Sequence, residues 1–124
     1  MQNQAVAAYQ QVAKQTASPT EREAELLTKS AQRLQKVRDD WDGSYAELAH
    51  ALKFTNSLWG ILLAAVASKE SPLPDNIRQN VANLGIFVLS RIVEIQLDPM
   101  PQKLDAIINI NRELAAGLRA NPSE

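Results

Sequence analysis

Three features of this sequence predict an all-α fold. Aliphatic residues recur at spacings of three and four over long segments, aromatic residues make up only 5% of a chain that is 45% hydrophobic, and proline-containing connectors separate the segments. An aliphatic core with helical periodicity favours packing of helix against helix. We therefore expect one domain over residues 1–124, an antiparallel helical bundle of four long helices plus an N-terminal helix.

The N-terminal helix is expected over residues 2–16, which are rich in the good helix formers Ala and Gln. Its apolar stripe has only Val6, Tyr9 and Val12 as sizeable members. Burying each gains about 1.5–3 kcal/mol at best, whereas ordering the backbone costs about 1–2 kcal/mol per residue. Two interpretations stay open: a detachable helix that places Val6, Tyr9 and Val12 at a partner-binding surface, or an ordinary fifth helix of the bundle.

Two capping boxes mark the starts of the next two helices. In Ser18-Pro19-Thr20-Glu21 a capping serine is followed by proline at the first helical position and by glutamate three residues later. This helix is expected to run to about Trp41, before Asp42-Gly43. Ser44-Tyr45-Ala46-Glu47 repeats the capping pattern and begins a helix that stops near Ser68.

The segment from Ser44 to Ala67 is apolar on two sides. One stripe consists of Tyr45, Leu48, Leu52, Thr55, Trp59, Leu62 and Val66, and the other of Ala51, Phe54, Leu58, Ile61 and Ala65. A surface helix needs only one such stripe. We therefore expect this helix to be sandwiched between neighbours, with Trp59 in the core.

Proline connectors bound the fourth helix and begin the fifth. The fourth helix is expected from Pro74 or Asp75, and it is apolar almost all round from Leu84 to Leu97, so it too is expected to be central. The connector Asp98 to Pro101 follows, because two prolines in four residues are incompatible with a continuous helix. The last helix has its inner stripe from Leu104 to Leu118 and ends at Asn121-Pro122.

The chemistry of the chain points to no catalytic, cofactor-binding or metal-binding residues. His50 is the only histidine and there is no cysteine, so ligands for a metal do not cluster in the sequence. Arg91 and Glu94 are expected to pair, because an isolated charge in so apolar a helix would be costly. Asn111 falls on the inner stripe of the last helix, where it either fixes the helix register or makes a polar contact with a bound peptide; we include it among the candidate partner-binding residues.

Four cations, Lys29, Arg33, Lys36 and Arg38, gather late in the second helix. They could contact RNA phosphates, but cations near a helix C-terminus are also favoured by the macrodipole. The net charge of −1 gives no general attraction to nucleic acid, so a solvated face is the preferred interpretation. With no basic leader, and with a longest apolar run shorter than the ~20 residues of a membrane span, we expect a cytoplasmic protein.

Seven short blocks extend over almost the whole chain. They are Tyr9-Gln10-Gln11, Thr16 to Glu23, Leu48 to Leu52, Asn56 to Trp59, Leu73 to Arg78, Leu84 to Val88 and Ile107 to Leu118. In their order and spacing these blocks resemble the FlaF family of flagellar proteins.

The resemblance implies a protein that promotes flagellin production and export. Such proteins act with the flagellin-message regulator FlbT and also oppose it. The resemblance also implies a secretion chaperone that binds newly made flagellin, prevents premature polymerisation and hands the subunit to the flagellar type III export apparatus. It supplies no catalytic residue and no cofactor. Two alternatives stay open: a post-transcriptional regulator that acts on flagellin mRNA directly or through FlbT, and a structural subunit with no chaperone role.

Overall fold

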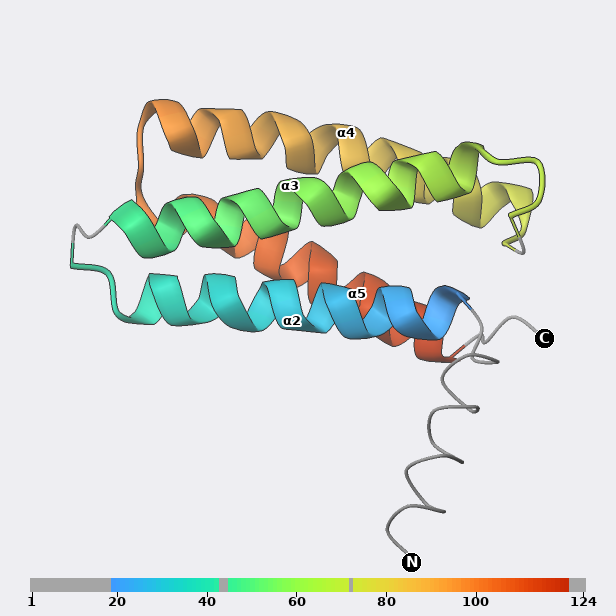
Figure 1. The fold of residues 1–124 in the computed structure, drawn as a ribbon, viewed down its shortest axis with the longest axis horizontal. Coiled ribbons are helices and arrows are strands. Elements are labelled where there is room, and N and C mark those ends of the chain that lie inside the picture. Colours follow the sequence, from blue (N-terminus) through green and yellow to red (C-terminus); the bar gives the residue numbers. More distant parts are fainter. Residues whose placement is uncertain (1–18, 43–44, 72, 121–124) are drawn as a thin grey trace, which may run out of the picture.

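The computed structural model describes residues 19–42, 45–71 and 73–120, and it confirms the all-α class (Figure 1). The α-helices within these residues are α2 (Pro19–Asp39), α3 (Tyr45–Ala67), α4 (Asp75–Leu97) and α5 (Asp105–Ala120), and a 3₁₀ turn, η1 (Pro101–Leu104), leads into α5. No strand occurs among them. The helix expected over residues 2–16 lies outside the described residues.

The helix boundaries follow the local signals in the sequence. Helix α2 begins at Pro19, whose fixed φ and missing N–H suit the first helical turn, and α4 begins directly after Pro74. Helix α2 ends at Asp39, two residues before the expected Trp41. The 3₁₀ turn at Pro101 was not expected; it carries the chain from the second proline connector into α5.

Consecutive helices run antiparallel, in an up-down-up-down order (Figure 1). Helix α2 packs most extensively against α5 and also against α3, α3 packs against α4, and α4 touches α5 only slightly. The neighbours are thus ordered α5, α2, α3, α4. Helix α4 lies at the outside of this arrangement, so the expectation that it is central was wrong.

The core is aliphatic around one large aromatic side chain. Trp59 is fully buried and is the largest such side chain, which confirms its expected place. The other buried members of the core cluster come from every described helix and from η1, and include Leu27, Leu52, Ile95, Leu104 and Ile108.

A short chain of buried polar side chains crosses this core. Trp59 donates its indole N–H to the amide oxygen of Asn111 at 2.9 Å, and the amide nitrogen of Asn111 donates to the Ser30 hydroxyl at 2.9 Å. The hydroxyls of Ser30 and Thr55 are 2.6 Å apart, and Thr55 also donates to the carbonyl of Ala51 at 2.8 Å. Each of these four side chains therefore has a hydrogen-bond partner, as buried polar groups require.

The expected sandwiching of α3 holds for one stripe and only partly for the other. The stripe that contains Trp59 is buried from Leu48 to Val66, and only Tyr45 at its start is exposed. In the second stripe Ile61 is 60% exposed. The reason is that α3 packs mainly against α2 and α4, and Ile61 lies on the part of its surface that neither helix covers.

Helices α3 and α4 approach each other closely at Gly85. A Cβ atom added at Gly85 would lie 2.6 Å from a methyl carbon of Leu63, a distance that side chains do not tolerate. Glycine at this position therefore leaves room for the Leu63 side chain against α4.

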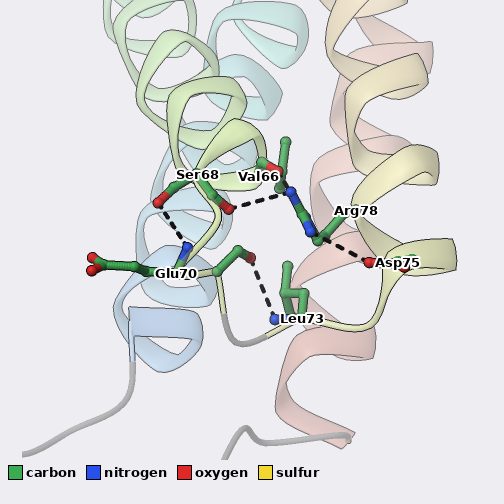
Figure 2. Close-up of polar contacts among 7 residues, drawn as sticks. Val66, Ser68, Glu70, Leu73, Asp75 and Arg78 are labelled. Carbon is green, nitrogen blue, oxygen red and sulfur yellow. Dashed lines mark hydrogen bonds and ion pairs between the residues drawn. The ribbon is translucent and has the colours of Figure 1, made fainter.

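Arg78 fastens the start of α4 to the end of α3 (Figure 2). Its guanidinium donates to the carbonyl of Val66 at 2.8 Å and to that of Ser68 at 3.2 Å, and it reaches the carboxylate of Asp75 at 3.3 Å. The last carbonyls of a helix have no partner within the helix. Arg78 satisfies one of them, that of Val66, and also binds the carbonyl of Ser68 just after the helix, so it holds α4 in place at this end.

The opposite end of the bundle is held by Arg38 and Asp105. The Arg38 guanidinium donates through two nitrogens to the two carboxylate oxygens of Asp105, one of them at 3.2 Å. The pair joins the last turn of α2 to the first turn of α5, where each charge also complements the helix dipole. The hydrogen bond with Asp105 raises the pKa of Arg38 above its usual range.

Candidate partner-binding surface

The outward side of α4 carries an apolar stripe that the other described elements leave largely uncovered, although Ala82 and Leu89 in it pack partly against the core. We call it the outer face of α4. It consists of residues at spacings of four, three, four and four, which places them on one side of a helix: Ala82, Ile86, Leu89, Val93 and Leu97. Ile86 is 64% exposed, Val93 52% and Leu97 81%. Isolated exposed apolar residues are common on proteins, but a row of them along one helix is typical of a binding surface.

The outer face of α4 contains no charged residue. Its exposed polar neighbours Gln79, Asn83, Ser90 and Gln96 are neutral, and Glu94, which lies between Val93 and Leu97 in the sequence, is charged. The charged residues of α4 are engaged elsewhere, because Arg78 and Asp75 pair at the start of the helix and the Nε atom of Arg91 lies 2.9 Å from a carboxylate oxygen of Glu94. The expected pairing of Arg91 with Glu94 is thus confirmed.

Among the described helices, α4 alone is long and apolar enough to cross a membrane by length and composition, with a mean hydropathy of 1.2 over an 18-residue window. Its inner side is part of the protein core, however, with Val81, Val88, Ile92 and Ile95 buried. The apolar character of α4 therefore has two separate causes: an inner stripe that packs on α3 and an outer stripe that faces away from it.

A cleft of about 580 Å³ lies between the end of α2 and the start of α3. Trp41 and Tyr45 form part of its wall, with their rings edge to face and their centroids 6.3 Å apart. Charges of both signs surround it, including Arg33, Asp40 and Glu47, and His50 is exposed at its rim. This mixture selects no particular ligand.

The four cations late in α2 all have partners within the protein. Lys29 and Arg33 lie over the ring of Phe54 from α3, at 5.7 and 4.8 Å from its centroid. Lys36 pairs with Asp40 at 3.5 Å, and Arg38 pairs with Asp105. The Phe54 ring thus comes from a different helix than the cations. Lys29 and Arg33 already lie over it.

Asn111 is not available to a partner. It is fully buried, and both ends of its amide are engaged, with Trp59 and with Ser30. Our inclusion of Asn111 among the partner-binding residues was wrong, and the alternative, an amide that fixes the helix register, agrees with the structure. The other candidates, Val6, Tyr9 and Val12, lie outside the described residues.

Sequence reasoning missed the outer face of α4. Its signal was present in the sequence as the nearly uniform apolarity of Leu84 to Leu97, which we interpreted as a sign of central packing. A helix that is apolar all round either is surrounded or keeps one apolar side for a partner, and the periodicity alone does not separate the two cases. Among the described residues no group of three His, Cys, Asp or Glu side chains is placed to hold a metal ion.

The fold and this surface define a class: a small antiparallel helical bundle that leaves an apolar face of one helix open. The family model described as flagellar protein FlaF matches residues 5–118. The chain belongs to the FlaF family, and it is therefore a flagellar protein, as the sequence resemblance implied. No curated protein and no solved structure gave a match to this chain.

Proposed function

We propose that this protein is a secretion chaperone for flagellin and a regulator of its synthesis. In this role it binds newly made flagellin, keeps it from polymerising and delivers it to the flagellar type III export apparatus. Membership of the FlaF family supports the flagellar part of this role. The observation that carries the chaperone part is the outer face of α4, whose exposed residues Ile86, Val93 and Leu97 are not needed by the described bundle.

The physical argument is one of matching surfaces. A subunit that assembles through helices must expose apolar helix surface before assembly, and such surface is best covered by another apolar helix face. The outer face of α4 offers this kind of cover. A chaperone that acts in this way requires no enzymatic group and no cofactor.

The contacts of the α2 cations favour regulation of flagellin synthesis through a protein partner over direct binding to RNA. The four cations of α2 pair with Phe54, Asp40 and Asp105. An RNA phosphate would have to compete with these contacts, and Lys36 and Arg38, which are paired with carboxylates, would add little release of bound counterions. A regulator of the FlbT type is the partner that we propose for this part of the function.

The test uses the purified protein with full-length flagellin and with flagellin truncated at either end. We expect binding to full-length flagellin, loss of binding with one of the two truncations, and slower polymerisation when the protein is in excess. Equal polymerisation rates with and without the protein would argue against the proposal. A salt-dependent mobility shift of the flagellin message, without binding to flagellin, would support the RNA regulator instead.

A further inference from the structure

We infer that the outer face of α4 is the docking site for a single amphipathic helix whose contacting stripe is apolar and free of charge. The inference rests on the proposed function, in which this helix belongs to flagellin. The anchors on this protein are Ile86, Val93 and Leu97, supported by the half-buried Leu89.

The shape of the surface selects a helix as the occupant. The anchors follow one another at positions i, i+7 and i+11, so they form a nearly straight ridge along α4. From Ile86 to Leu97 this ridge is about 17 Å long, at 1.5 Å per residue. A helix laid along such a ridge meets it with its own residues at i, i+3 or i+4, and i+7, which is the usual mode of helix recognition.

The charge of the surface selects an uncharged stripe on that helix. The neighbours of the ridge are the neutral Gln79, Asn83, Ser90 and Gln96 and the charged Glu94, and the neutral ones cannot neutralise a charge that the partner buries. A buried charge without a counter-charge is costly. Arg91 and Glu94, the nearest charged groups on α4, already pair with each other, and Arg91 also lies over the Phe87 ring.

The same neutrality argues against a lipid surface as the occupant. Helices that lie in the membrane interface usually carry lysine and arginine on their polar face, which attract anionic lipids. The exposed neighbours of the outer face are instead neutral amides, a serine and the carboxylate of Glu94, and none of these is a cation. The inner side of α4 is in addition held in the core through Val88 and Ile92.

A second copy of this chain is a poorer occupant on grounds of area. A stable homodimer buries about 800 Å² on each partner. The ridge, about 17 Å long and one helix diameter of about 10 Å wide, offers only a fraction of that. Docking of one helix through three anchors fits this area, and it gives the reversible contact that handing on a subunit requires.

The first experiment places a charge in the proposed contact. The variants are Ile86→Glu and Leu97→Glu, and the matched control is Ile61→Glu. Ile61 is of the same residue type as Ile86 and is nearly as exposed, 60% against 64%, but it lies on α3. The Phe54 ring contacts Lys29 and Arg33 of α2. Ile61 is seven residues, or two helical turns, after Phe54 and therefore lies on the same side of α3, which borders α2. Helix α4 instead packs against α3 at Leu63.

We expect Ile86→Glu and Leu97→Glu to weaken binding of purified flagellin by about tenfold or more, because a carboxylate would be buried without a partner. Ile61→Glu should bind as the parent does, and all three variants should keep the parent's helical spectrum because the replaced side chains are exposed. Binding by all three variants at the parent's affinity would overturn the inference and leave the proposed function standing. A parent protein that binds no flagellin would overturn both.

The second experiment identifies the occupant and does not depend on a loss of affinity. The chain has no cysteine, so Leu97→Cys and the control Ile61→Cys can each carry a single photo-reactive label. We expect the label at position 97 to crosslink to one helical segment of flagellin and the label at position 61 to give none. Crosslinks from position 97 to a second copy or to residues 1–17 of the same chain would overturn the inference, as would flotation of the parent protein with phosphatidylglycerol vesicles.

Discussion

The indole nitrogen of Trp59 lies 2.9 Å from the amide oxygen of Asn111, and this hydrogen bond joins two helices whose Cα atoms stay more than 8 Å apart. Trp59 extends from α3 across the middle of the bundle and Asn111 reaches it from α5. The indole N–H can only donate, so it fixes the orientation of the amide, whose nitrogen then donates to Ser30 of α2. Three helices are thus aligned by one buried contact chain.

Truncation of Trp59 should destabilise the whole bundle. We expect Trp59→Ala to lower the free energy of unfolding by about 3–5 kcal/mol, the usual cost of removing a large buried aromatic side chain. Urea denaturation followed by circular dichroism measures this directly. The half-buried Trp41 provides the control, because Trp41→Ala should cost clearly less. A Trp59→Ala protein that unfolds at the parent's midpoint would contradict the buried position.

Removal of the Asn111 amide should be costly because it leaves a buried donor without an acceptor. We expect Asn111→Ala to cost at least about 1–3 kcal/mol. In a cycle with Trp59→Phe, the two changes should be non-additive by about 0.5 kcal/mol or more, since both remove the same hydrogen bond. Additive effects would show that the bond contributes nothing beyond the packing of the two side chains.

Two glycines should respond to alanine in opposite directions. Gly60 is exposed in the middle of α3 and has nothing within 4 Å of an added Cβ, so Gly60→Ala should stabilise the protein by about 1 kcal/mol through helix propensity. At Gly85 the added Cβ would meet Leu63 at 2.6 Å. Gly85→Ala should therefore destabilise by about 1–3 kcal/mol through overpacking. Thermal unfolding of the two variants beside the parent tests the pair, and equal shifts of the same sign would refute the close approach of α3 and α4.

Glu23 should make stability depend on pH. Burial raises the pKa of the Glu23 carboxyl above its usual range, so the folded state disfavours its charged form. The resulting loss of stability is absent below the unfolded-state pKa of about 4.3. It grows as the pH rises and is complete above the folded-state pKa. Glu23→Gln should therefore raise the unfolding midpoint at pH 7 and have no such effect below about pH 4.

The exposed Glu25 on the same helix provides the control for this pH series. Glu25→Gln should leave the difference between pH 7 and pH 4 as it is in the parent protein. If Glu23→Gln gave the same gain in stability at both pH values, hydrogen bonding or helix propensity would be the cause and not the burial of a charge.

Deletion of residues 1–17 tests the prediction made for the N-terminal segment. We expect a folded product with altered affinity for flagellin, because the gain from the apolar stripe of this segment and the cost of ordering it nearly balance. In the full chain, the amides of Tyr9 and Val12 should exchange with solvent far faster than those from Leu48 to Val66. A deletion product that unfolds would make the segment part of the core.

The sequence predicted the elements of this fold well because their signals are local. Proline at position 19 and the prolines before Asp75 and Asp105 act within a few residues, so they locate helix ends without knowledge of the rest of the chain. The three-four spacing around Trp59 likewise identified a core stripe. The cations of α2 show the limit, since their partners Phe54 and Asp105 lie on α3 and α5 and no local pattern connects them.

The sequence by itself determined the all-α class, the helix ends and the burial of Trp59, because these depend on the periodicity and chemistry of single segments. Only the tertiary structure decided which of the two apolar stripes of α4 is buried, and that Asn111 faces Trp59 and not a partner. The physical reason is that the rotation of α4 about its own axis depends on packing with α3 and the rest of the core, including the contact of Gly85 with Leu63. That rotation leaves Ile86, Val93 and Leu97 exposed, and it is set by packing between segments that no single-helix pattern encodes.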